Sequence, residues 1–455
     1  MTRIPIALAC MTMSAALAAE PIAYPPTATV PVVETRFGEQ VADPYRWLEG
    51  DVRTDAKVRG WTEAENRVTE KYLAALPGRD VFMARMRALQ DFERYGIPRE
   101  AGGRYFYTYN TGLQNQSTLW VREGLEGAPR LLIDPNAWAK DGATALAEWA
   151  ASEDGGLLAY AVQDGGTDWR TIHVLNVATG KPLSDEVRWV KFSNTAWLKD
   201  GSGFFYSRFP EPDGRTLFTG EDVNQSVWLH RIGTPQSVDI EIYATPRDPK
   251  LSHTARVTDD GRYLLITTTR GTDPRNAVEI ARLDGSAIRP RALVAGLDHN
   301  WDLAGAKGAS LWFVTDLGAP RQRIVVLDAE HPARAPRPVV PEVAETLVGA
   351  SLVGDRLVVA YLGDAKSQAE LWTLDGRRVG GVALPGIGTA VGFAGRNRNS
   401  ESFFSFSSFA TPPTVYRYDT ATNRAALFAA PRVAFDPQAY DTHQIFFPSK
   451  DGTRV

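Results

Sequence analysis

Two short phrases alternate along most of this chain, and this repetition restricts the fold more than any other feature. The first phrase is a turn containing Asp, Gly or Lys, followed by a strand in which aromatic and smaller residues alternate. Its clear copies are AGGRYFYTYN from Ala101, EDGGLLAYAV from Glu153, KDGSGFFYSRF from Lys199 and DDGRYLLITTT from Asp259. Weaker copies start at Ala306, Val353 and Arg398. Alternation with a period of two predicts β-strands.

The second phrase is an apolar strand that ends in a turn with Asp, Asn or Gly. Its copies start at Leu119, His173, Val227, Glu279, Ile324, Leu371 and Val415. The two phrases interleave seven times, with a period of about 45–55 residues. A repeat of this length made only of strands and turns is typical of a β-propeller blade. The alternative, a stack of unrelated β-sandwiches, would produce seven interleaved pairs of these phrases only by chance. We therefore predict an all-β fold, a seven-bladed β-propeller over residues 91–437.

Helical spacing precedes the repeats. Apolar residues recur at steps of three and four from about Val52 to Leu76, and a second short pattern runs from Val81 to Leu89. Pro77 and Gly78 separate the two patterns. Apolar stripes of this kind are packing faces, so we assign no ligand site here. Residues 20–90 are predicted to form a short α-helical segment.

Residues 1–19 have the composition of a secretory signal peptide. Arg3 supplies a positive charge, Ile4 to Leu17 is an apolar run, and small residues follow. This predicts export to the periplasm or the cell exterior, with no membrane association after signal removal, because no later segment could span a bilayer. A disordered start of a cytosolic protein and a lipoprotein signal at Cys10 are the alternatives.

Several kinds of chemistry lack the residues they need. Cys10 is the single cysteine, so the mature chain would have no disulfide and no thiolate. The net charge of −4 provides no basic field for nucleic acid. The six histidines stand singly, and G-x-S-x-G, zinc, calcium and phosphate-loop motifs are absent from the sequence. We predict no metal, no cofactor and no catalytic residue in this chain.

Three aspartates could be interpreted as carboxylates for general acid/base catalysis. Asp154, Asp200 and Asp260 each lie directly before a glycine in a copy of the first phrase. An Asp at this position usually accepts a hydrogen bond from its own turn. We therefore interpret them as turn residues that recur because the blade recurs.

The chain closes on FFPSKDGTRV, where Asp451 and Gly452 form a strong two-residue hairpin signal. The residues after this turn would begin a second strand.

Five stretches together resemble the prolyl oligopeptidase family of serine peptidases. They are DPYRWLE from Asp43, YFYTYNTGLQNQSTLWV from Tyr105, SEDG from Ser152, VKFSNTAWLKDGSGFFYSRFP from Val190, and the final FFPSKDGTRV. The likeness covers nearly all of the mature chain in order, and YNTGLQNQ favours the prolyl-cleaving branch over the branch that cuts after basic residues.

The resemblance implies a division of the chain between two domains. In this family a seven-bladed propeller caps an α/β-hydrolase domain, so residues 20–90 would belong to the hydrolase side and residues 438–455 would begin the hydrolase sheet. The Ser, Asp and His of the triad would then follow Val455. We therefore expect the N-terminal and propeller portion of an exported prolyl endopeptidase, present as a truncated product or fragment and inactive alone.

The resemblance also implies partners and lining residues. The full enzyme would cleave short proline-containing peptides, and the propeller would gate their access to the missing hydrolase domain of the same polypeptide. By local alignment, the residues that line the pocket upstream of the proline fall at Val174, Ser252 and Thr272, and all three depart from the family's aromatic, Met and Cys. Ordinary blade positions remain an alternative reading of these three. The alternative function is a stand-alone, non-catalytic propeller that binds peptides or a partner protein.

Overall fold

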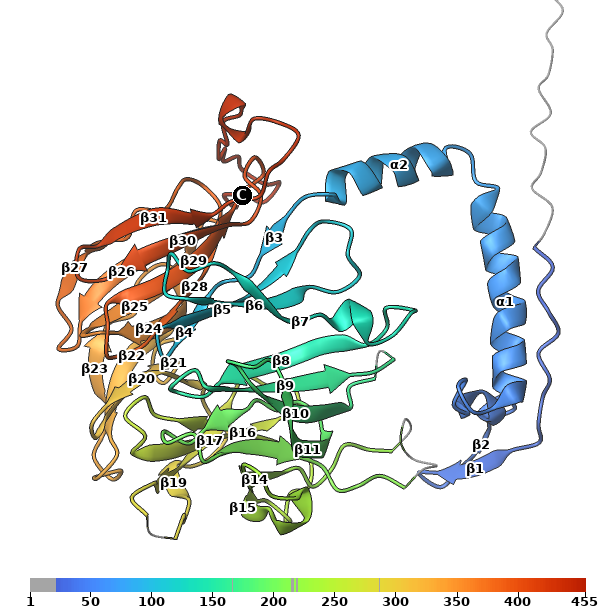
Figure 1. Cartoon of the computed structure of the whole chain (residues 1–455), viewed down its shortest axis with the longest axis horizontal. Helices are drawn as coiled ribbons and strands as arrows, with labels where there is room; N and C mark the ends of the chain where they lie inside the picture. Colours follow the sequence, from blue (N-terminus) through green and yellow to red (C-terminus); the bar gives the residue numbers. More distant parts are fainter. Residues whose placement is uncertain (1–21, 166, 214–216, 218–219, 286) are drawn as a thin grey trace, which may run out of the picture. The chain divides into compact units, whose positions relative to one another are not determined.

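The computed structural model describes residues 22–455 apart from 166, 214–216, 218–219 and 286 (Figure 1). The predicted signal peptide lies outside the described residues. The chain divides into two compact units, the first ending at Ala88 and the second running from Leu89 to Val455.

The first unit opens with a hairpin of strands β1 (Val33–Arg36) and β2 (Glu39–Ala42). Phe37 and Gly38 between them both have positive φ, at 51° and 86°. Two left-handed residues give a turn whose twist matches that of the strands it joins. A short 3-10 helix, η1 (Arg46–Glu49), follows.

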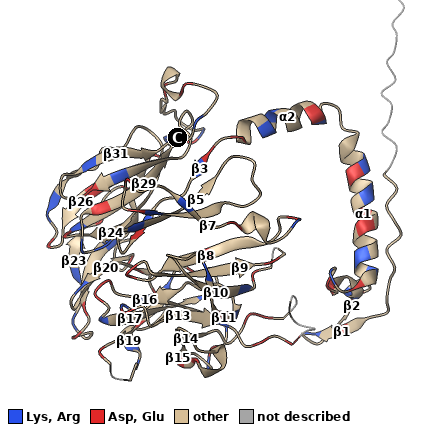
Figure 2. Ribbon diagram, viewed as in Figure 1, with Lys and Arg blue, Asp and Glu red and all other residues tan. Residues whose placement is uncertain are grey.

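Helices α1 (Ala56–Ala74) and α2 (Arg79–Gln90) come next. The Asp55 side chain accepts hydrogen bonds from the backbone N–H groups of Lys57 and Val58, which caps α1. Figure 2 shows charged residues of both signs along both helices. In the described structure Val58 is the one buried residue of α1, and α2 has none. The assignment of these helices to a hydrolase domain therefore stays a prediction.

The second unit consists mainly of antiparallel sheets in which strands follow one another in chain order. Four sheets have four strands each. They are β16–β19 (Leu251–Val257, Tyr263–Arg270, Asn276–Arg282, Arg291–Val294), β20–β23 (Trp301–Lys307, Ser310–Thr315, Arg323–Asp328, Arg337–Val340), β24–β27 (Thr346–Val353, Arg356–Gly363, Lys366–Thr373, Arg378–Gly381) and β28–β31 (Thr389–Gly395, Glu401–Ser407, Thr414–Asp419, Arg424–Ala429).

Two larger sheets come before these four. The first has five strands: β3 (Arg94–Tyr95), β4 (Arg99–Ala101), β5 (Arg104–Asn110), β6 (Thr118–Glu123) and β7 (Arg130–Ile133). The second has eight: β8 (Ala145–Ala151), β9 (Leu157–Gln163), β10 (Arg170–Asn176), β11 (Pro182–Val190), β12 (Ala196–Trp197), β13 (Gly203–Arg208), β14 (Ser226–Arg231) and β15 (Ile240–Ala244). The short 3-10 helices η2 (Pro135–Ala137), η3 (Gln236–Val238) and η4 (Pro437–Ala439) lie in connections.

The all-β propeller fold is confirmed, but seven separate blade sheets are not seen. In the described part of the second unit, five sheets have the four or five strands of one blade, and the sixth has eight. The reason is local: the last residue of β11, Val190, pairs with Arg208 of β13, which joins two successive repeats into one sheet.

The apolar core lies between successive repeats. One cluster joins Leu265 and Phe313 of neighbouring sheets, and another joins Leu357 to Trp312. Within the eight-stranded sheet, Ile172 of one repeat packs in a common cluster with Phe204 of the next. Each sheet therefore buries its faces against its neighbours, as a propeller requires.

The predicted turn at Asp451-Gly452 is present. Phe447 and Val455 exchange two backbone hydrogen bonds of 2.9 Å, and Gly452 has a φ of 83°. Whether this hairpin belongs to a larger sheet stays a prediction.

Candidate functional site

The Asp-Gly turns of the repeats have the local structure that their sequence predicts. The side chains of Asp154, Asp200 and Asp260 accept hydrogen bonds of 2.9, 3.0 and 3.1 Å from the backbone N–H two residues later. The glycine that follows each one has positive φ, between 65° and 75°. These carboxylates therefore stabilise their own turns, which confirms the prediction that they are turn residues.

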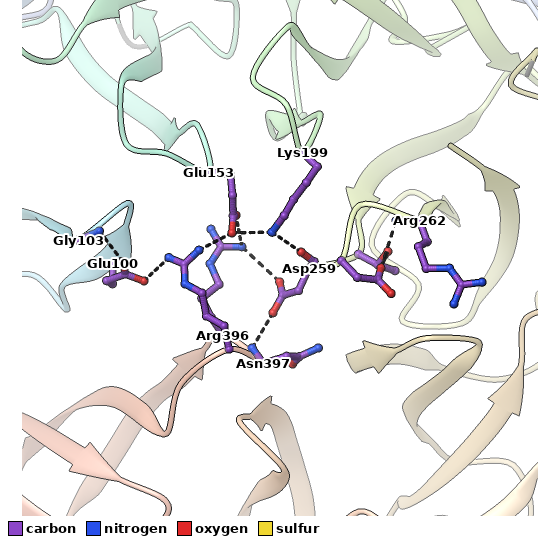
Figure 3. A network of polar contacts seen from close by, with 11 residues as sticks. Glu100, Gly103, Glu153, Lys199, Asp259, Arg262, Arg396 and Asn397 are labelled. Carbon is purple, nitrogen blue, oxygen red and sulfur yellow. Dashed lines mark hydrogen bonds and ion pairs between the residues drawn. The ribbon is translucent and has the colours of Figure 1, made fainter. Parts of the chain in front are cut away.

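Glu153, Lys199 and Asp259 each stand directly before one of these aspartates, and their side chains lie around a common centre (Figure 3). Lys199 Nζ donates to Glu153 Oε1 at 2.7 Å and to the backbone oxygen of Asp259 at 2.7 Å. One lysine thus connects three successive repeats.

A single turn of the last sheet completes this arrangement. Arg396 Nη1 donates to Asp259 Oδ1 at 3.2 Å and lies 3.5 Å from Glu153 Oε2. The backbone N–H of Asn397 donates to Asp259 Oδ2 at 3.0 Å. Arg398 donates to Glu153 and, at 2.6 Å, to Glu100 Oε2 in the middle of β4. The turn between β28 and β29 therefore reaches three other sheets.

We call Glu100, Glu153, Lys199, Asp259, Arg396 and Arg398 the central network. Its three carboxylates and three cations balance in charge. The Glu100 and Glu153 side chains are only 14% and 18% exposed. Desolvation opposes the charge of Arg398, but the hydrogen bond to Glu100 and the charges of Glu100 and Glu153 outweigh it and raise the pKa of Arg398. The network is therefore a partly buried set of ion pairs that hold one another in place.

The central network borders two cavities. The larger, the central cavity, has a volume of about 690 Å³ and is lined by inner-strand residues such as Arg99, Trp149 and Arg256. The second, of about 240 Å³, includes Lys307 and Arg398. Side chains of the central network line both cavities.

A second candidate region contains several aromatic residues, two of which have a strained backbone conformation. Trp189 and Phe192 both have positive φ, at 63° and 50°. Trp169 makes edge-to-face contacts with Trp189 and Phe209, and Lys191 Nζ lies 4.4 Å from the Trp169 ring centre while pairing with Asp222 at 2.8 Å. Backbone strain of this kind is concentrated at functional sites. Phe192 is 49% exposed.

The three residues assigned from the resemblance lie on two different sheets, with Ser252 and Thr272 at the same end of the β16–β17 hairpin. Val174 of β10 is fully buried in the cluster that joins two repeats of the eight-stranded sheet. Ser252 lies half-buried in β16, and Thr272 is exposed in the turn after β17. None of them lines the two cavities above. Their role at a substrate pocket stays a prediction.

The central network itself was missed by the sequence analysis. A signal exists, because a charged residue stands directly before the Asp-Gly of the copies that start at Glu153, Lys199 and Asp259. That signal cannot show which charges meet, since the partners lie far apart in the chain.

No group of His, Cys, Asp or Glu is arranged to hold a metal ion within the described part of the chain. Among the residues placed by the structure, no helix has the length and apolar character needed to cross a membrane.

Comparison with protein families gives one match to most of the chain. Residues 25–431 match the family described as "Prolyl oligopeptidase, N-terminal beta-propeller domain". The prolyl endopeptidase of Elizabethkingia meningoseptica is 34% identical over 434 residues, which is 95% of this chain and 60% of that protein. The prolyl endopeptidase of Elizabethkingia miricola is 33% identical over the same shares. This chain therefore spans about 60% of the length of these relatives.

Solved structures give the same result. A chain from a study of two prolyl endopeptidases and their inter-domain dynamics is 47% identical, with a TM-score of 0.75, over 95% of this chain and 62% of that one. Prolyl oligopeptidase B from Galerina marginata, bound to a 25-residue macrocyclization substrate, is 27% identical with a TM-score of 0.82, over 95% of this chain and 64% of that one.

Proposed function

Because this chain belongs to the prolyl oligopeptidase family, we propose that it forms the propeller part of a serine endopeptidase that cleaves short peptides after proline. The family match over residues 25–431 supports this proposal. In the proposed enzyme, the catalytic nucleophile, base and acid come from an α/β-hydrolase domain of the same polypeptide. The propeller controls which molecules reach these catalytic groups.

One observation supports the gating role above all others: the central network borders both cavities. Its partly buried ion pairs span several sheets, and a turn of the last sheet contributes Arg396 and Arg398 to them. A cavity of about 690 Å³ has the size of sites that hold small ligands, so an extended peptide fits and a folded protein does not.

We also propose that the eight-stranded sheet is two blades, which gives seven blades in all. The support is the apolar cluster between its halves, in which Val187 of one repeat meets Tyr206 of the next. In the described chain there are seven such clusters, each between two neighbouring repeats. A single continuous sheet would not fold back to bury side chains between its halves.

Peptide entry can be tested with a single fluorescent label, because Cys10 is the one cysteine of the sequence. Ala394→Cys places a thiol on an exposed residue that lines the central cavity, and Thr179→Cys places one in an exposed turn as the matched control. Maleimide dyes on the two mature variants would report binding at each position.

A short proline-containing peptide should change the fluorescence of the Ala394→Cys label with saturation and leave the Thr179→Cys label unchanged. The same peptide sequence embedded in a small folded protein should affect neither label. An equal response of both labels, or a response to the folded protein, would refute the gating role. The 455-residue chain alone should leave a chromogenic prolyl peptide uncleaved, whatever the labels report.

Export is a separate part of the proposal, supported by the composition of residues 1–19. Removal of about 19 residues takes away Arg3 and leaves a net charge of −5, from 49 basic and 54 acidic side chains. Intact-mass measurement of protein from the exported fraction tests this, and a mature chain that starts at Met1 or Thr2 would refute it.

A further inference from the structure

Two arginines in the central cavity lie outside the central network. Arg99 is the first residue of β4, and Arg256 lies near the end of β16; both are exposed and both line the cavity. Along β16 the buried His253 and Ala255 alternate with the exposed Thr254 and Arg256. Since successive side chains of a strand point to opposite faces, Arg256 belongs to the face that borders the cavity.

Both guanidinium groups have N–H donors that are not used in the contacts with the protein. Arg99 Nη1 donates to the backbone oxygen of Trp149 at 3.4 Å, and its guanidinium lies 4.9 Å from the Trp149 ring centre. Arg256 Nη1 donates to the backbone oxygen of Leu303 at 2.6 Å. A guanidinium has five N–H donors, so each of these arginines keeps several for a ligand.

The acidic side chains of the cavity are engaged elsewhere. Glu100, Glu153 and Asp259 belong to the central network, and Glu401 accepts from Arg417 and, at 2.6 Å, from the Tyr105 hydroxyl. Within the described residues, neither Arg99 nor Arg256 has a carboxylate within the 4 Å of an ion pair.

The surroundings of the two arginines favour an incoming negative charge. Although both side chains are accessible within the cavity, the surrounding protein desolvates them and lowers the pKa of Arg99 and of Arg256. Asp259 and Asp302 act on Arg256 in the opposite sense from a greater distance, and Arg396 adds to the lowering. Protein walls of low polarity strengthen the field of a charge that faces a cavity.

We propose that the guanidinium groups of Arg99 and Arg256 each bind a carboxylate in the central cavity, which gives this cavity a preference for peptides that carry a free carboxylate. The proposal rests on the proposed function, because it assumes that peptides occupy the cavity. The planar guanidinium donates two parallel hydrogen bonds to a carboxylate, a geometry that a lysine lacks. The carboxylate is supplied either by the peptide C-terminus or by an acidic side chain.

Three peptides of the same proline-containing sequence separate these possibilities. The first has a free C-terminal carboxylate, the second a C-terminal amide, and the third a C-terminal amide with glutamate as the last residue. Affinity for the mature chain is measured by fluorescence of the Ala394→Cys label. The first or the third peptide should bind about tenfold more tightly than the second, the size expected of one charge-assisted hydrogen bond.

Arginine variants locate the preference. Arg99→Gln and Arg256→Gln should each reduce it, and the double variant should bring all three affinities within about twofold. Arg291→Gln is the matched control, because Arg291 also donates to one backbone oxygen, that of Ala329, and does not line the central cavity. Inorganic phosphate should compete with the carboxylate peptides and not with the amide, and added salt should weaken the preference.

The outcomes distinguish the two proposals. Equal binding of all three peptides overturns the carboxylate site and leaves the cavity as a peptide site. A preference that survives in the double variant also overturns it. If no peptide binds, the gating role itself is refuted, and the carboxylate site with it. Thermal unfolding of each variant shows whether a lost preference reflects a lost fold.

Discussion

Arg398 Nη2, in the turn between β28 and β29, donates a 2.6 Å hydrogen bond to Glu100 Oε2 of β4, 298 residues earlier in the chain. In the described part of the chain, no strand of the sheet β3–β7 pairs with a strand of the sheet β28–β31. The first and last sheets are therefore held together by side chains. The Tyr105 ring meets Phe403 edge-to-face at 5.9 Å, and Arg432 pairs with Glu93 at 2.8 Å.

Substitution of Arg398 should weaken the contact between the first and last sheets, which we call the seam. Arg398→Gln should lower the free energy of unfolding by about 1 kcal/mol, because Glu100 and Glu153 are mostly buried and each loses a charged donor. Urea unfolding measures the loss. Arg275→Gln is the control, since its ion pair with Asp273 lies within one exposed loop and should change stability by less than about 0.5 kcal/mol. Equal effects of the two variants would show that the network does not hold the seam.

His253 should make the protein less stable in mild acid. Burial lowers its pKa from 6.5 to about 4, and its ring nitrogens contact only the hydroxyls of Thr268 and Thr245, at 3.0 and 3.1 Å. The unfolded chain therefore binds a proton below pH 6.5 that the folded chain refuses until about pH 4. Since one pKa unit corresponds to about 1.4 kcal/mol, stability should fall by about 3 kcal/mol over this range.

His253→Gln should remove that part of the pH dependence while also lowering stability at neutral pH. Unfolding free energies at several pH values between 4 and 7.5 test this, with the exposed His443→Gln as the control. A variant whose pH profile stays parallel to that of the wild type contradicts the assignment.

His230 should have the opposite pH dependence. Its ring is fully buried, with Nδ1 2.8 Å from Asp239 and Nε2 3.0 Å from Asp185. Desolvation would lower the pKa of His230, but the hydrogen bonds and charges of the two aspartates outweigh it and raise this pKa above its ordinary value. Its stabilising contribution is therefore complete below about pH 6.5 and disappears as the pH rises through the folded-state pKa.

His230→Gln should cost about 3–5 kcal/mol in mild acid, the usual cost of removing one partner of a buried ion pair, and less at alkaline pH. Urea unfolding at pH 5.5 and pH 9 measures both values. A cost that grows toward alkaline pH would show that the ring is neutral in the folded protein.

Proteolysis should begin outside the repeats. Within the described structure α1 buries only Val58 and α2 buries no residue, and segments with so little burial open at small free-energy cost. Limited digestion with mass spectrometry should leave a resistant core from about Asp91 to about Pro437. First cuts between Gly201 and Asp260, with Trp61 and Phe446 still protected, would show that these boundaries are wrong.

Local features were predicted well because neighbours in the chain produce them. The turn at Asp260 depends on a bond to Arg262 two residues away and on a glycine that tolerates positive φ, and both can be read from DDGRY. The run from Tyr263 to Arg270 likewise predicted a strand, although Tyr263 to Ile266 are all buried and do not alternate between a buried and an exposed face. The division of the strands into separate sheets could not be predicted in the same way, because the pairing of Val190 with Arg208 depends on how two successive repeats meet.

The sequence alone determined the strands, the turns and the propeller class, because these follow from side-chain periodicity and from conformational preferences over a few residues. Only the tertiary structure decided which charges form a site. Glu153 and Arg398 are 245 residues apart and meet because successive sheets turn their inner ends toward one centre. Arg99 and Arg256 likewise share a cavity although nothing in their local sequences connects them. Interactions between charges depend on distance in space, which the order of residues along the chain does not express.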